Sequence, residues 1–101
     1  MRLNVNTAVT TLGGEVLQDE QGEITFARIF IEFLMGLSDR DKALSGARKL
    51  ERARLAERVH QAAVGSGEVE ITVAEAAEIK ELVGHIGTPL VVLNVERFIE
   101  G

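Results

Sequence analysis

The sequence has no cysteine, no tryptophan and no tyrosine, and it has one proline among its 101 residues. Without cysteine the chain has no disulfide, no thiol nucleophile and no cysteine-based zinc site. Phenylalanine, present four times, is the only large aromatic residue type. Proteins bind single-stranded nucleic acids largely by stacking bases on aromatic side chains, so this shortage argues against that mode of binding.

Long apolar runs are also missing. No run approaches the roughly 18 residues that a membrane-spanning helix needs, so we expect no membrane association. The first residues, MRLNVNTAVTTL, lack a basic region followed by an apolar stretch, and no signal peptide is expected. The composition, 46% hydrophobic and 27% charged, is ordinary for a folded domain. The length fits a single domain over residues 1–101.

The charge is unevenly distributed along the chain. Residues 39–61 contain seven basic and four acidic residues, whereas the rest of the chain contains four basic and twelve acidic residues. The net charge of −5 therefore conceals a basic middle segment between acidic flanks. We favour charge pairing within the chain or between subunits as the explanation. A surface that binds nucleic acid is the second explanation, but it usually requires a domain that is basic overall.

The first 25 residues predict a small β-hairpin or meander. Residues 2–10 alternate between apolar and polar positions, as in a half-buried strand. Gly13 and Gly14 indicate a turn, residues 15–18 could form a second short strand, and residues 19–23 form a polar tip.

An apolar helix is predicted over residues 26–37, with Thr25 as its N-cap. Its apolar residues recur at helical spacing and surround most of the helix. A chain of this length could lack the mass to cover such a helix, so we expect its surface to mediate self-association. The predicted interface residues on this helix are Phe26, Ile29, Phe30, Phe33, Leu34 and Leu37.

A basic amphipathic helix is predicted over residues 45–64, beginning at Ser45 and ending before the Gly65-Ser66-Gly67 turn. Its apolar stripe is thin and rich in alanine. Arg48, Arg52 and Arg54 on its charged face form the second predicted interface, which could meet an acidic patch on another subunit or on a partner protein.

The last third of the chain has the features of a helical hairpin over residues 72–101. Thr72 and Glu75 have the spacing of a capping box, and Thr88-Pro89 is a typical helix start. Residues 68–72 alternate and could pair as a short strand with the N-terminal element. The predicted fold class is α+β and mainly helical, with about four helices after the β-element.

No pattern indicates catalysis. The two histidines, His60 and His85, occur in no metal-binding motif, and the glycines match no phosphate-binding loop. Glu75, Glu78 and Glu81 are spaced three residues apart, which is typical of a solvated helix face. We therefore predict no catalytic residue, no metal and no cofactor, and we expect that the chain is not an enzyme.

Three segments resemble small accessory proteins of tailed bacteriophages and prophages. The segments are GEVLQDEQGEITFARIF, LSGARKLERARLAERVH and EIKELVGHIGTPLVVLNVERFIEG, and together they cover most of the chain. The ending is similar to a KxLVGxxxxPLVVxxxxxxLEG pattern typical of those proteins. The resemblance implies a phage-encoded accessory or morphogenetic protein that works through protein contacts, in the host bacterial cytoplasm or on the virion. It implies no activity, cofactor or functional residue.

The leading functional hypothesis is thus a non-enzymatic phage or prophage protein that acts through protein–protein contacts in assembly or as a virion component. A homo-oligomer is expected, with another phage protein or a host protein as a further partner. The first alternative is a small acidic inhibitor of a host defence or nucleic-acid-handling protein, similar to anti-CRISPR proteins. The second alternative, which the acidic flanks disfavour, is a nucleic-acid-binding regulator that uses the helix 45–64.

Overall fold

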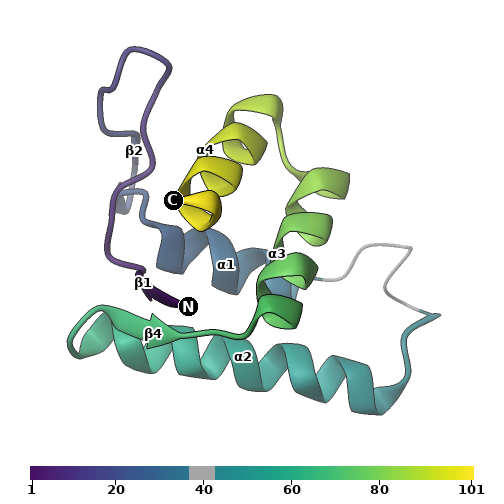
Figure 1. The fold of residues 1–101 in the computed structure, drawn as a ribbon. Coiled ribbons are helices and arrows are strands. Elements are labelled where there is room, and N and C mark those ends of the chain that lie inside the picture. Colours follow the sequence, from purple (N-terminus) through teal and green to yellow (C-terminus); the bar gives the residue numbers. More distant parts are fainter. Residues whose placement is uncertain (37–42) are drawn as a thin grey trace.

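The computed structural model describes residues 1–36 and 43–101, and these residues form a mainly helical α+β fold. Figure 1 shows α2 along one edge of the molecule, with α3 and α4 rising from it as a hairpin and α1 behind them. The predicted fold class is therefore confirmed. The elements in chain order are β1 (Arg2–Asn4), β2 (Gln18–Asp19), β3 (Gly22–Glu23), α1 (Phe26–Met35), α2 (Gly46–Val64), β4 (Glu68–Glu70), α3 (Val73–Ile86) and α4 (Pro89–Glu100).

The N-terminal strand pairs with a strand that follows α2. β1 and β4 are antiparallel, and Leu3 lies opposite Val69 with both side chains buried. This confirms the predicted pairing of the 68–72 segment with the N-terminal element. A second antiparallel pair, β2 and β3, closes the polar tip with Gln18 opposite Glu23.

The predicted strand over residues 2–10 is regular only in its first part. The backbone N–H and the hydroxyl of Thr7 both donate to the carbonyl of Asn4, and the backbone N–H of Asn6 donates to the Asn4 side chain. These local hydrogen bonds make a turn where a strand ladder would otherwise continue. Residues 8–10 of the predicted strand pair only through isolated bridges, Ala8 with Thr25 and Thr10 with Val16.

All four described helices begin at the hydroxyl residues that the sequence predicts. Thr25, Ser45 and Thr88 each accept a hydrogen bond from the backbone N–H three residues later. Thr72 and Glu75 form the complete capping box that begins α3. Each cap satisfies a backbone donor that has no partner inside the helix, which is why these boundaries could be predicted.

Helix α1 lies at the centre of the hydrophobic core. Phe30 is 1% exposed, and the ring of Phe26 stacks on that of Phe98 from α4 with centroids 3.9 Å apart. Helix α2 covers one side of α1 and makes the most extensive contact with it, while α3 packs on another side. The core therefore joins every helix to α1.

The prediction that α1 mediates self-association is wrong for those of its residues that lie in this core. The chain itself buries them, because α2, the α3–α4 hairpin and the N-terminal segment together supply enough cover. Phe33 is half-buried, and Leu37 lies outside the described residues. The four core residues of the predicted interface are Phe26, Ile29, Phe30 and Leu34.

Candidate functional site

A groove with a volume of about 700 Å³ runs between α2 and α3. The backbones of these two helices make little contact with each other in the described part of the chain, so side chains bridge the space between them. Leu55 and Leu82 line the groove but are only 4% and 6% exposed, and the small side chains of Ala74 and Ala77 leave it open along α3. Arginines of α2 and glutamates of α3 line the rest of it.

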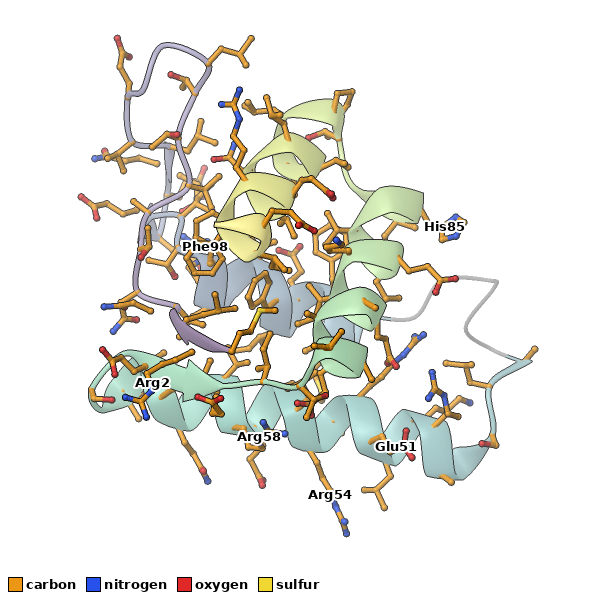
Figure 2. The ribbon with its side chains drawn as sticks, in the orientation of Figure 1. Arg2, Glu51, Arg54, Arg58, His85 and Phe98 are labelled. Carbon is orange, nitrogen blue, oxygen red and sulfur yellow. The ribbon has the colours of Figure 1, made fainter. Side chains whose placement is uncertain are left out.

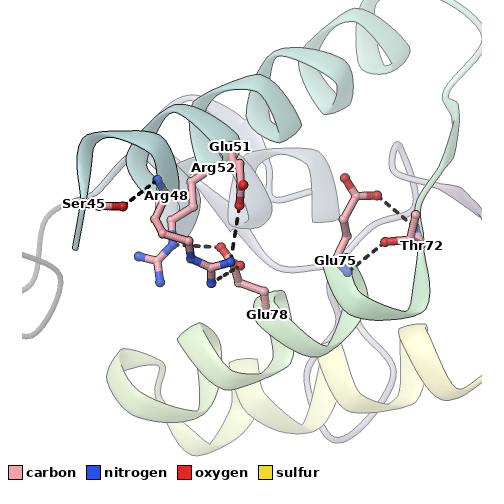
Figure 3. A network of polar contacts seen from close by, with 7 residues as sticks. All are labelled: Ser45, Arg48, Glu51, Arg52, Thr72, Glu75 and Glu78. Carbon is pink, nitrogen blue, oxygen red and sulfur yellow. Dashed lines mark hydrogen bonds and ion pairs between the residues drawn. The ribbon is translucent and has the colours of Figure 1, made fainter.

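One glutamate of α3 binds two arginines of α2 (Figure 3). Glu78 accepts from Arg48 Nη2 at 2.8 Å and from Arg52 Nε at 2.9 Å, with one carboxylate oxygen for each arginine. The side chains of Arg52 and Glu78 are only 11% and 19% exposed. Their mutual attraction is therefore screened less than that of a surface pair.

A second ion pair joins the two helices at the start of α3. Arg58 Nη1 lies 2.6 Å from Glu75 Oε2, and the same guanidinium donates to the backbone carbonyl of Glu70. Glu75 also accepts from the backbone N–H of Thr72 in the capping box. The hydrogen bond from Arg58, followed by that from Thr72, holds the pKa of the Glu75 carboxyl below its ordinary value. Glu75 therefore couples the start of α3 to α2.

This lowered pKa predicts a pH-dependent stability. The carboxylate contributes its full stabilisation above the ordinary glutamate pKa of 4.5, and the contribution is lost as the pH falls through the lower pKa of the folded state. We expect Glu75→Gln to lower the free energy of unfolding by about 1 kcal/mol at pH 7 and to flatten its decline below pH 4.5. Urea unfolding at a series of pH values measures both effects. The matched control is Glu20→Gln on the exposed tip, and equal pH profiles for the two variants would contradict the prediction.

The predicted interface on α2 consists of three arginines, and two of them form ion pairs with α3. Arg48 and Arg52 bind Glu78, as the favoured explanation of intramolecular charge pairing requires. Arg54 is exposed, and Figure 2 shows its side chain pointing away from the body of the molecule. Arg54 therefore lies at the edge of the groove and points outwards, whereas Arg48 and Arg52 bridge the groove to α3.

The glutamates that pair with α2 were not recognised from the sequence. The spacing of Glu75 and Glu78 predicts a solvated face, but both turn towards α2 and are only partly exposed. The available signal was the excess of arginine in residues 39–61 beside glutamates spaced three apart on the next helix. Spacing alone could not show that these two faces meet.

Neither histidine lies in a metal cluster. His60 and His85 are exposed, and His85 Nε2 is 4.0 Å from a carboxylate oxygen of Glu81 on the same helix. Within residues 1–36 and 43–101 no three histidine, aspartate or glutamate side chains are grouped so that they could hold a metal ion. None of the helices in those two ranges is long and apolar enough to cross a membrane.

The groove between α2 and α3 is thus the candidate functional site, with alanine and leucine surface between two sets of ion pairs. The sequence matches no protein-family model, and no curated protein or solved structure is significantly similar to it.

Proposed function

We propose that this chain is a non-enzymatic accessory protein of a tailed bacteriophage or prophage, and that it acts by binding other proteins during assembly or in the virion. The groove between α2 and α3 supports the protein-binding part of the proposal, and the resemblance of three segments to phage proteins supports the rest. The partner segment that fits it is an amphipathic helix, because such helices place apolar residues at intervals of three and four into a groove of this kind.

The chemistry of the groove supports a protein partner in preference to a charged small molecule. Its four arginines are matched by four glutamates, so the lining has no net charge to attract an anion or a cation. Ala74 and Ala77 are exposed and small, which allows a second helix to approach α3 closely. Ile86, which is 50% exposed, adds apolar surface at the far end of the groove.

The alternative of a nucleic-acid-binding regulator has less support. Arg48 and Arg52, two of the three arginines that would contact phosphates, already bind Glu78, and breaking these pairs would oppose nucleic-acid binding. The alternative of a host inhibitor uses the same kind of protein contact and differs in the identity of the partner. Virion-associated and cytoplasmic roles in the host bacterium likewise differ in where that partner is found.

The test is site-specific photo-crosslinking from the groove. A photoreactive residue at Ala74 should capture one specific protein in cells that carry the encoding phage or prophage. Ala77→Trp should abolish this capture, because the indole ring fills the groove, whereas Val73→Trp should preserve it. Val73 is the matched control because it is exposed on the same helix but does not line the groove.

The identity of the captured protein then separates the functions. A phage structural or assembly protein supports the proposal, whereas a host defence protein favours the inhibitor alternative. Capture that is equal in the Ala77→Trp and Val73→Trp variants would show that the groove does not bind the partner.

A further inference from the structure

We propose that the chain forms a symmetric, antiparallel homodimer through the outer face of α2, in which Arg54 of each copy pairs with Glu57 of the other. This inference concerns the side of α2 that is turned away from the groove, and of its residues only Arg54 also lies at the edge of the groove. The outer face comprises Ala47, Leu50, Arg54, Glu57, Gln61 and Val64.

The outer face is a continuous stripe that no described element covers. Its six residues follow one another at intervals of three, four, three, four and three, which places them on one side of the helix. All six are exposed, and Leu50 and Val64 are 50% and 74% exposed. The residues of α2 that face the core are instead Leu55, Ala56 and Val59. Figure 1 shows α2 at the edge of the molecule, so its outer face is accessible along its length.

The two charged residues at the centre of the stripe differ from the other three arginines of α2. Arg48, Arg52 and Arg58 on the same helix each form an ion pair. In contrast, neither Arg54 nor Glu57 forms an ion pair or a side-chain hydrogen bond with any residue in the described ranges. The side chain of Arg54 extends into solvent (Figure 2). Both charges are therefore available to a partner.

The stripe is complementary to itself when a second copy runs in the opposite direction. With a two-fold axis passing between Leu55 and Ala56, Arg54 lies opposite Glu57 of the second copy. The same axis places Leu50 opposite Gln61 and Ala47 opposite Val64, so a single register aligns all three pairs. Spacings of three and four are those of the contact positions in an antiparallel helix pair, and a two-fold axis repeats each contact twice.

This self-complementarity identifies the occupant as a second copy of the chain. Each half of the stripe supplies one charge, and the axis joins each charge to its opposite, so no other protein is needed to neutralise them. The apolar residues lie at both ends, where alanine faces valine and allows close approach. Each α2 helix of 19 residues is about 28 Å long, and the six residues that it contributes are fewer than the roughly 20–30 a side of a standard specific interface. The dimer is therefore reversible and depends on concentration.

The test reverses the charge of Arg54 or Glu57 and measures the oligomeric state by sedimentation velocity. Circular dichroism verifies that each variant is folded. Arg54→Glu alone places four glutamates at the centre of the interface, and Glu57→Arg alone places four arginines there. Each variant should be monomeric at concentrations at which the wild type is a dimer, with a dissociation constant raised about tenfold or more by like-charge contacts. Because both residues are exposed and unpaired in the described ranges, both variants should fold.

Mixing the two monomeric variants should restore a dimer, because every glutamate of one copy then faces an arginine of the other. The double exchange, Arg54→Glu with Glu57→Arg, should also form a dimer by itself. A monomeric wild type, single variants that remain dimeric, or a mixture that stays monomeric would each overturn the proposal. The groove variant Ala77→Trp should leave the dimer intact, so failure of the proposed function and failure of the dimer are distinguishable.

Discussion

Replacing Phe30 with alanine is expected to lower the free energy of unfolding by about 3–5 kcal/mol. Phe30 is 1% exposed, and its ring lies 6.0 Å from the rings of both Phe26 and Phe98. Truncation therefore removes contacts between α1 and α4 and leaves a cavity that the surrounding helices fill only in part. Small domains are stable by about 5–15 kcal/mol in total, so the variant should be marginally folded.

Urea unfolding followed by circular dichroism measures this loss. Leu12→Ala is the control, because Leu12 is 80% exposed and its truncation should change stability by no more than about 0.5 kcal/mol. The experiment also separates a core role of α1 from the self-association role that the sequence indicated. A Phe30→Ala variant that remained fully stable but changed its oligomeric state would contradict the core position.

Replacing Gly67 with alanine is expected to destabilise the protein by about 2 kcal/mol or more. The φ angle of Gly67 is 87°, in the left-handed region that side chains disfavour. An added Cβ would also lie 2.8 Å from Oδ1 of Asn4 and 3.0 Å from Nδ2 of Asn6. The Asn6 side chain donates to the carbonyl of Ala63 in α2, so displacing it disturbs the junction of α2 with the N-terminal segment.

Gly14→Ala is the matched control for this effect. The φ angle of Gly14 is 89°, close to that of Gly67, but nothing lies within 4 Å of an added Cβ. The control therefore incurs the backbone cost of about 1–2 kcal/mol without the clash. Chemical denaturation measures the free energy of unfolding of both variants. The difference between their losses is the cost of the clash with Asn4 and Asn6. Equal losses would mean that the Asn4 and Asn6 side chains move aside at no cost.

The Gly67 experiment concerns the junction where the N-terminal segment meets the helices. The backbone N–H of Val5 donates to the carbonyl of Gly67, and that of Ala27 donates to the carbonyl of Val5. The first segment of the chain thus connects the end of α2 to the beginning of α1. Its integrity also holds α2 in place, and with it both the groove and the outer face on which the two proposals rest.

The sequence by itself determined the type of each helix and the residue at which it begins. Thr25, Ser45, Thr72 and Thr88 start helices because a side-chain oxygen and a backbone donor only three residues apart satisfy each other. The pairing of β4 with the N-terminal element could also be predicted, because alternation identifies a strand that needs a partner. These are local rules, and a window of a few residues contains the information that they use.

Only the tertiary structure decided which surfaces are covered. The apolar stripe of α1 looks the same whether its own chain or a second subunit buries it, and here α2 and the α3–α4 hairpin bury it. The glutamates of α3 likewise look solvated until α2 is placed beside them, where Glu78 binds Arg48 and Arg52. The packing of α2 also separates Arg48 and Arg52, which pair with α3, from Arg54, which points outwards at the edge of the groove. Helix periodicity defines the faces of each helix, but which face meets which depends on contacts between residues far apart in the sequence.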